Sequence, residues 1–188
     1  MRILDTPIDG VNVIEFAQIS DDRGYFARTF CAREFERRGL KATVSQANLS
    51  FSNRKGTIRG MHFQAPPVAE AKLMRCTRGA IVEMVVDLRP ESSTFLQHFA
   101  VELTADNCKA LYVPERFANG YQALTDAAEA AYHVSEFYTP GYEGGVRFDD
   151  PLLALPWPTQ ATMVSDKDRS WPLLDDTRIA TIRRELRV

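Results

Sequence analysis

Any imidazole chemistry in this chain must come from three histidines, His62, His98 and His133. His62 lies between an arginine and a glutamine in the otherwise apolar segment 57–64. Because imidazole titrates near neutral pH, a histidine in such a segment can serve as a general base. The alternative is a core histidine whose ring is satisfied by a backbone partner. The local pattern leaves both interpretations open.

A tyrosine pair in segment 128–138 provides the second candidate for acid–base chemistry. Strand side chains repeat with a period of two, so Tyr132 and Tyr138 are expected on the same face of this segment. Tyrosines in strands commonly serve as large packing residues. The functional interpretation makes one tyrosine a proton donor and the other a platform for stacking.

Lys72 is the third candidate. It begins the run KLMRC (72–76), in which Lys72 and Cys76 share one face, and Leu73 and Arg75 share the other. A lysine at the edge of a sheet is usually just solvated. If Lys72 instead faces the interior of a barrel, its charge needs a function there, such as stabilising a developing enolate oxygen.

Several other chemistries lack the residues that they need. The chain contains no His-x-His and no His-x-x-x-His pattern, so we expect no metal site inside a barrel. It also contains no GxGxxG, Walker or GxSxG motif, which removes the usual support for redox and hydrolase functions.

Length and composition indicate an ordinary globular protein. The 188 residues fit one domain, which we assign to residues 1–188. A net charge of −2 lacks the basic excess of nucleic-acid-binding proteins. No stretch approaches the roughly 20 apolar residues of a membrane helix, and the first ten residues lack the apolar run of a signal peptide. Three widely spaced cysteines suggest no disulfide framework. We expect a cytoplasmic protein that binds neither nucleic acid nor membrane.

Short strands separated by turn residues account for most of the pattern. We expect strands at Val11–Phe16, Thr43–Asn48, Thr57–Phe63, Lys72–Thr77, Ala80–Asp87, His98–Leu103, Ala110–Val113 and Glu129–Phe137. Two helices are expected at Ala32–Arg38, where Gly39 follows as a C-terminal cap, and at Asp176–Leu186. This arrangement predicts a mainly β fold, an antiparallel double-sheet jelly roll with a few short helices.

The segments that carry these candidates also carry a family resemblance. Over nearly its whole length the chain resembles the dTDP-4-dehydrorhamnose 3,5-epimerases. The matching runs are DRGYF (22–26), QANLS (46–50), RGMHFQ (59–64), KLMR (72–75), VDLR (86–89), VPERFANG (113–120), YHVSEFY (132–138), DDP (149–151), PWP (156–158) and SDKD (165–168). Each run is weak alone, but their order and spacing together are specific for the superfamily.

The resemblance implies a cupin-type jelly roll that forms a homodimer, in which each protomer lends residues to the site of its partner. It implies a reaction without metal or redox cofactor, because the 4-keto group of the substrate acidifies the hydrogens at C3 and C5. A base removes one hydrogen, an enolate forms, and a proton returns on the opposite face. By resemblance, His62 is the base, Asp168 orients and charges it, Tyr132 is the acid, and Lys72 stabilises the enolate.

The resemblance also implies a nucleotide-diphosphate sugar as the substrate, with its cationic partners facing the diphosphate. Tyr138 would stack on the nucleotide base and Glu143 would lie at the edge of the pocket. Unbroken strand alternation would send Arg59 and His62 to opposite faces, and a bulge at Gly60 would reconcile them. The other substrate-binding candidates are Arg23, Phe26, Arg28, Gln46, Asn48, Arg59, Asn119 and Lys167.

Two positions depart from the family pattern. Arg28 stands where the family usually has a glutamate, and Asn119 stands where it usually has a histidine. The first change reverses a charge near the nucleotide, and the second replaces a titratable ring with an amide. The alternatives to a 3,5-epimerase are therefore an enzyme that inverts only C3 or only C5, one that uses another nucleotide sugar, or a cupin that binds such a sugar without turning it over.

Overall fold

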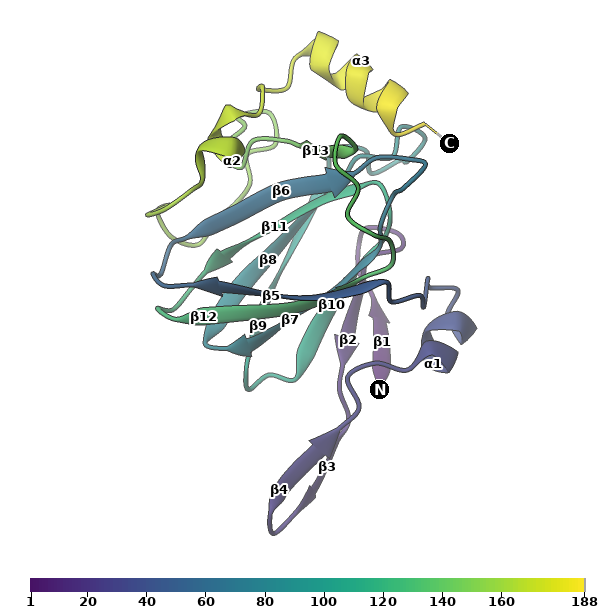
Figure 1. Ribbon diagram of the computed structural model, residues 1–188, viewed down its shortest axis with the longest axis vertical. Helices are drawn as coiled ribbons and strands as arrows, with labels where there is room; N and C mark the ends of the chain where they lie inside the picture. The colour runs from purple at the N-terminus through teal and green to yellow at the C-terminus, as the bar shows by residue number, and fades with distance from the viewer. Residues whose placement is uncertain (188) are drawn as a thin grey trace.

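Antiparallel strands dominate the regular structure of residues 1–187, the part of the chain that the computed structural model describes (Figure 1). A six-stranded sheet has the order β1-β2-β10-β7-β12-β5, and a five-stranded sheet has the order β13-β6-β11-β8-β9. In the first sheet the bounds are β1 Arg2–Asp5, β2 Asn12–Glu15, β10 Lys109–Val113, β7 Lys72–Arg78, β12 Ala128–Val134 and β5 Gln46–Ser52. In the second they are β13 Glu143–Gly145, β6 Ile58–Gln64, β11 Phe117–Ala123, β8 Ala80–Asp87 and β9 His98–Thr104.

The two sheets pack face to face, as the predicted jelly roll requires. Apolar side chains that alternate along the strands meet between them. Met74 and Leu111 come from the first sheet, and Val85, Leu103 and Phe117 come from the second. Each is at most 4% exposed. The predicted fold class is confirmed, and the space between the sheets is where a site can form.

Three helices in the described residues cover the outer faces: α1 (Ala32–Arg37), α2 (Asp166–Ser170) and α3 (Asp176–Glu185). The chain after α1 turns at Gly39, whose φ of +74° suits the predicted glycine cap. Phe35 of α1 packs on Ile14 and Tyr112 of the first sheet. Ile182 of α3 belongs to the apolar cluster on the outside of the second sheet. Neither of these helices nor α2 is long and apolar enough to cross a membrane.

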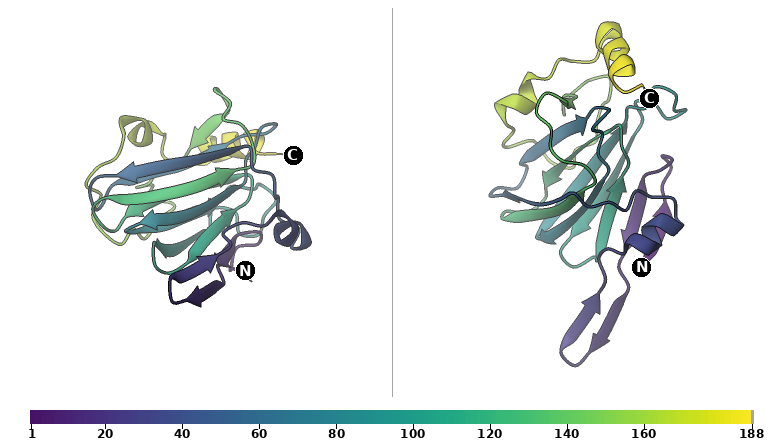
Figure 2. Two further views of the ribbon diagram at one scale, coloured as in Figure 1. Left: turned by 60° about the horizontal axis from the view of Figure 1, so that its bottom comes forward. Right: turned by 45° about the vertical axis from the view of Figure 1, so that its right-hand side comes forward.

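A separate hairpin of β3 (Gln18–Asp21) and β4 (Gly24–Ala27) projects from the body of the molecule (Figures 1 and 2). The sequence patterns did not predict these strands. Its apolar side chains Ile19, Tyr25 and Phe26 are 70%, 55% and 63% exposed. Such a group of exposed apolar residues is typical of a surface that contacts another protein molecule.

Candidate active site

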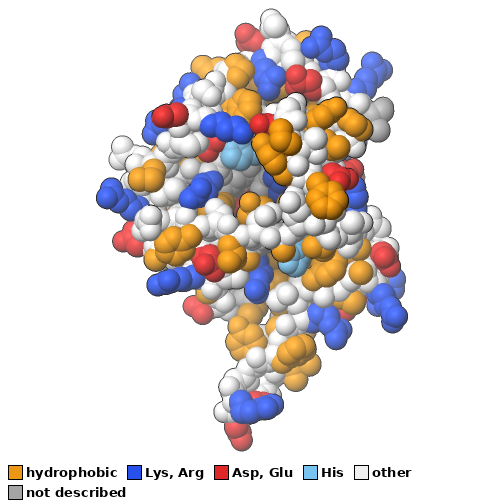
Figure 3. All heavy atoms as spheres, in the orientation of Figure 1, with side chains coloured by type: hydrophobic (Ala, Val, Ile, Leu, Met, Phe, Trp, Pro, Cys, Tyr) orange, Lys and Arg blue, Asp and Glu red, His pale blue; other side chains and the backbone are white. Residues whose placement is uncertain are grey.

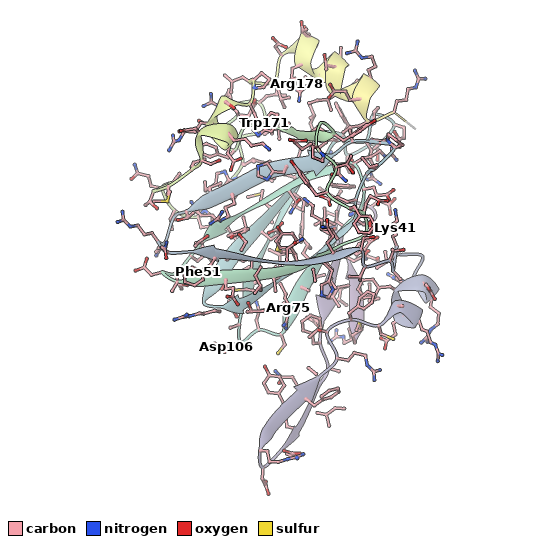
Figure 4. The ribbon with its side chains drawn as sticks, viewed as in Figure 1. Lys41, Phe51, Arg75, Asp106, Trp171 and Arg178 are labelled. Carbon is pink, nitrogen blue, oxygen red and sulfur yellow. The ribbon has the colours of Figure 1, made fainter. Side chains whose placement is uncertain are left out.

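A cavity of about 430 Å³ opens between the two sheets. Figure 3 shows a hollow on this face, with lysine and arginine side chains at its rim, and Figure 4 shows side chains of β6 and of β5 and β12 projecting toward one another. Both sheets and the segment that ends in α2 supply its walls. The polar lining includes Ser50, Arg59, His62, Lys72, Asn119, Tyr132, Ser165, Lys167 and Asp168.

A bulge in β6 brings Arg59 and His62 to the same cavity. On β11, Asn119 pairs with His62 and Tyr121 pairs with Arg59, so two residues of β6 lie opposite one residue of β11. The expectation from unbroken alternation is therefore wrong, and the hypothesised bulge at Gly60 is confirmed. Gly60 has a φ of +133°, and a Cβ there would lie 2.5 Å from the Cα of Gly120. Only glycine fits both the conformation and the space.

His62 and Asp168 form a hydrogen-bonded pair at the wall of this cavity. His62 Nε2 lies 2.6 Å from Asp168 Oδ1, and the Gly60 amide donates to Asp168 Oδ2 at 3.3 Å. The His62 side chain is 40% exposed to the cavity, whereas that of Asp168 is only 5% exposed. The carboxylate therefore fixes the ring from behind, and the other ring nitrogen remains free to accept a proton.

The start of α2 holds Asp168 in place. The Ser165 side chain caps this helix and accepts a hydrogen bond from the Asp168 amide at 3.1 Å. Burial alone would raise the pKa of the Asp168 carboxyl, but the hydrogen bonds from His62 and Gly60 outweigh it, and the pKa lies below the ordinary value of 3.8. Asp168 is thus a carboxylate at neutral pH, and it can accept a hydrogen bond from the His62 ring.

Lys72 lines the cavity from β7. Of the two orientations that the sequence left open, solvent or the interior of the barrel, the structure shows the interior. The Lys72 ammonium group donates to Asn119 Oδ1 at 2.8 Å and lies 3.1 Å from Glu70 Oε1. The side chain is only 13% exposed. A positive charge held by two oxygens in the largely buried wall of a cavity can stabilise negative charge that develops on a ligand.

Tyr132 lines the cavity from β12, in the sheet opposite that of His62. Burial, followed by the charge of Glu70, raises the pKa of its hydroxyl above the ordinary value of 10.0. The group therefore keeps its proton at neutral pH. A protonated acid on one sheet and an imidazole on the other provide a donor and an acceptor on two walls of the cavity, which suits proton transfer to the two faces of a bound ligand.

The rim of the cavity carries a second set of predicted residues. The Tyr138 amide donates to Gln46 Oε1 at 2.8 Å, and its hydroxyl donates to Glu143 Oε1 at 3.2 Å. Lys167 Nζ lies 3.7 Å from the same carboxylate oxygen. An adjoining cavity of about 160 Å³ is lined by Tyr138, Glu143 and Lys167 as well as by His62 and Lys72. Since His62, Lys72 and Lys167 line both cavities, the rim residues lie next to the main cavity.

Asn48 lies beside Tyr132 in the pairing of β5 with β12. The other binding candidates, Arg23, Phe26 and Arg28, lie on or directly after the β3–β4 hairpin. Within residues 1–187, none of these three side chains lines the cavity or the adjoining one. Arg23 instead pairs with Asp21 at 2.5 Å.

Sequence reasoning missed two residues that support the site. Ser50 lines the cavity and lies 2.8 Å from the Tyr121 hydroxyl. Glu83 lies behind Asn119, within hydrogen-bonding distance of its amide. For Glu83 a signal was available, because it is the only charged residue within the apolar run AIVEMVV (80–86). Within residues 1–187, no three His, Cys, Asp or Glu side chains gather in a way that suits a metal ion.

A double-sheet jelly roll with a histidine–aspartate pair and a protonated tyrosine around one cavity defines a cupin-type protein equipped for acid–base isomerisation. The model of the dTDP-4-dehydrorhamnose 3,5-epimerase family matches residues 5–176. The chain belongs to this family, whose members are isomerases, and the resemblance found in the sequence is confirmed.

Individual relatives agree over almost the full length. The dTDP-4-dehydrorhamnose 3,5-epimerase of Methanothermobacter thermautotrophicus is 37% identical over 95% of this chain and 97% of its own. The dTDP-4-dehydrorhamnose 3-epimerase of Streptomyces niveus is 38% identical over 96% of this chain and 87% of its own. The crystal structure of the 3,5-epimerase of Bacillus anthracis with TDP and PPi bound is 39% identical, covers 92% of this chain and 99% of its own, and has a TM-score of 0.88.

Proposed function

We propose that this enzyme epimerises a dTDP-linked 4-keto-6-deoxyhexose at C3 and C5 by proton transfer through an enolate. The observation that carries the proposal is the placement of His62, which pairs with Asp168 of α2, on one sheet and of Tyr132 on the opposite sheet, around one cavity. Family membership supports the same reaction, since relatives carry the name dTDP-4-dehydrorhamnose 3,5-epimerase.

In the proposed reaction, His62 takes a proton from the carbon next to the ketone, and the electron pair of the broken C–H bond forms the enolate. The Lys72 ammonium stabilises the enolate oxygen. Tyr132 then gives its proton to the carbon from the opposite face, and the new C–H bond restores the ketone. His62 has gained one proton and Tyr132 has lost one, so exchange with solvent restores both groups. Asp168 stabilises the imidazolium that forms.

We propose that Arg59 and Lys167 face the diphosphate, because both cations lie at the same cavity. Tyr138, which is 58% exposed, offers a free ring face for the nucleotide base. Gln46, Asn48 and Glu143 would complete the polar rim. We further propose that residues 1–188 act as one epimerase domain, although Val188 lies outside the described residues.

We propose a homodimer in which the β3–β4 hairpin of each protomer reaches the site of its partner. The apolar side chains of this hairpin support the proposal, because more than half of the surface of Ile19, Tyr25 and Phe26 is exposed. Such a dimer would bring Arg23, Phe26 and Arg28 to the nucleotide. A cytoplasmic location is also proposed, since Cys31, Cys76 and Cys108 are all free thiols.

The test is incubation with dTDP-4-keto-6-deoxyglucose in heavy water, with deuterium at C3 and C5 followed by NMR. Uptake at both carbons is expected of a 3,5-epimerase. A folded protein that binds dTDP but incorporates no deuterium with this or any other nucleotide-linked 4-keto sugar would contradict the proposal and favour a non-catalytic binding protein.

A restricted epimerase is the second candidate. Asn119 holds Lys72 through an amide that cannot accept or release a proton at working pH. One relative of similar identity is a 3-epimerase. Deuterium at a single carbon in the same experiment would favour this candidate over the first.

The substitution Arg28→Glu tests the choice of nucleotide. Arg28 is exposed and directly follows the β3–β4 hairpin. If it faces the nucleotide of the partner, reversing its charge should raise the affinity for dTDP relative to other nucleoside diphosphates, measured by calorimetric titration. The same reversal at Arg33, on the exposed side of α1, provides the control. Unchanged relative affinities in Arg28→Glu would separate Arg28 from nucleotide choice.

A further inference from the structure

Glu83 is a carboxyl group buried beside the candidate active site. It lies on β8 between Ile81 and Val85, whose side chains belong to the core between the two sheets. Strand alternation therefore turns Glu83 toward the same inter-sheet space. It is 0% exposed, and its Oε2 has no hydrogen-bond partner among residues 1–187. Burying a carboxyl group in this way is costly, which calls for a functional reason.

Glu83 is linked to Lys72 through one amide. Asn119 Nδ2 donates to Glu83 Oε1 at 2.8 Å, and Asn119 Oδ1 accepts from Lys72 Nζ at 2.8 Å. Because the nitrogen of Asn119 faces an acceptor and its oxygen faces a donor, the two partners fix which way the amide points. Removing Glu83 would leave the buried amide nitrogen unpaired and free the amide to rotate away from Lys72.

We propose that Glu83 is a positioning residue, which orients Asn119 so that Asn119 holds the Lys72 ammonium at the cavity. The inference rests on the proposed function, since Lys72 is there the group that stabilises the enolate. Asn119 and Glu83 together would then perform the positioning task at the place where the family usually has a histidine.

The neutral state of Glu83 has a physical basis. Burial raises the pKa of this carboxyl to about 8, although the hydrogen bond from Asn119 and the charge of Lys72 both act to lower it. The titratable groups around it are Lys72 of β7, Tyr121 of β11 and Tyr132 of β12, and Glu70 lies 3.1 Å from the Lys72 ammonium. Glu70 already pairs with Lys72, and a second carboxylate at Glu83 would offset the charge of Lys72 further. A neutral acid leaves that charge available to an enolate oxygen.

Two substitutions separate the neutral acid from the carboxylate. Glu83→Gln keeps an acceptor for Asn119 without charge, so its kcat for deuterium exchange should remain near that of the unmodified enzyme. Glu83→Leu removes the acceptor, so kcat should fall by up to about 10²-fold while KM changes little, the loss that a displacement of about 1 Å can cause. An equal loss in both variants would overturn the inference, because the charge would then be needed. An unchanged kcat in Glu83→Leu would overturn it as well.

Asp87→Asn is the matched control. Asp87 lies on the same strand, is also 0% exposed, and bonds to Arg89, Ser92 and Thr94, away from the cavity. Its substitution should lower the thermal stability and leave kcat unchanged. If Asp87→Asn lowers kcat as much as Glu83→Leu, a general disturbance of β8 explains the loss, and the inference fails.

A stability measurement tests the neutral acid without substrate. In an unfolded chain a glutamate ionises near pH 4.5, whereas folded Glu83 keeps its proton up to about pH 8. Between these values the unfolded chain binds fewer protons, so Glu83 makes stability fall as pH rises. Glu83→Gln should remove this fall in Tm, and identical pH profiles would overturn the inference. If the unmodified enzyme exchanges no deuterium, the proposed function fails, and these Tm profiles alone decide the protonation of Glu83.

Discussion

His62→Ala is expected to lower the rate of deuterium exchange at the sugar carbons by roughly 10²–10⁴-fold, the usual contribution of a positioned acid or base. The substitution removes the proposed base, while Asp168, Lys72 and Tyr132 remain at the cavity. Binding of dTDP should stay measurable, because the proposed nucleotide contacts lie at the rim. Exchange followed by NMR and dTDP affinity followed by calorimetry give the two readings.

The chain provides its own control for this substitution. His98 is an exposed histidine on β9 and does not line the cavity, so His98→Ala should leave the exchange rate unchanged. Retained turnover in His62→Ala would remove His62 from the mechanism. A loss of folding would be visible in the circular dichroism spectrum and would call for His62→Gln, which retains a polar group that can meet Asp168.

The fold could be predicted from the sequence because several strands alternate between apolar residues that face the core and more polar residues that face away from it. All eight predicted strands have a counterpart in the two sheets. Strand β11 was missed, since each of its residues from Phe117 to Ala123 is buried and no alternation marks it. The β3–β4 hairpin was missed for the opposite reason, because most of its residues are exposed.

The site could be predicted in part from the residues themselves. Local patterns indicated His62, Tyr132 and Lys72, and the structure places all three at one cavity. Asp168 could not be found in this way. It lies 106 positions from His62 in the sequence, and only tertiary packing brings α2 against β6, so the resemblance alone pointed to it. Arg59 faces the cavity only because β6 contains a bulge. Gly60 made a bulge possible, but the sequence alone could not show that one forms.

Tyr132→Phe is expected to separate deprotonation from inversion. The phenylalanine retains the ring and its packing but has no proton to give. His62 should still remove the hydrogen, so deuterium should enter the sugar with its original configuration kept. Formation of the inverted sugar should fall by roughly 10²–10⁴-fold. NMR coupling patterns distinguish the epimers, and the deuterium content is read from the same spectra.

The control for Tyr132→Phe is Tyr112→Phe, which deletes the hydroxyl of a buried tyrosine from the same sheet. Tyr112 packs on Phe35 at the outer face, and its hydroxyl accepts from the Lys41 amide at 2.9 Å. Its loss should lower stability without changing inversion. Burial raises the pKa of the Tyr132 hydroxyl above its ordinary value of 10.0. Loss of the Tyr132 proton should therefore slow inversion by the unmodified enzyme only above pH 10. Unchanged inversion in Tyr132→Phe would show that another group delivers the proton.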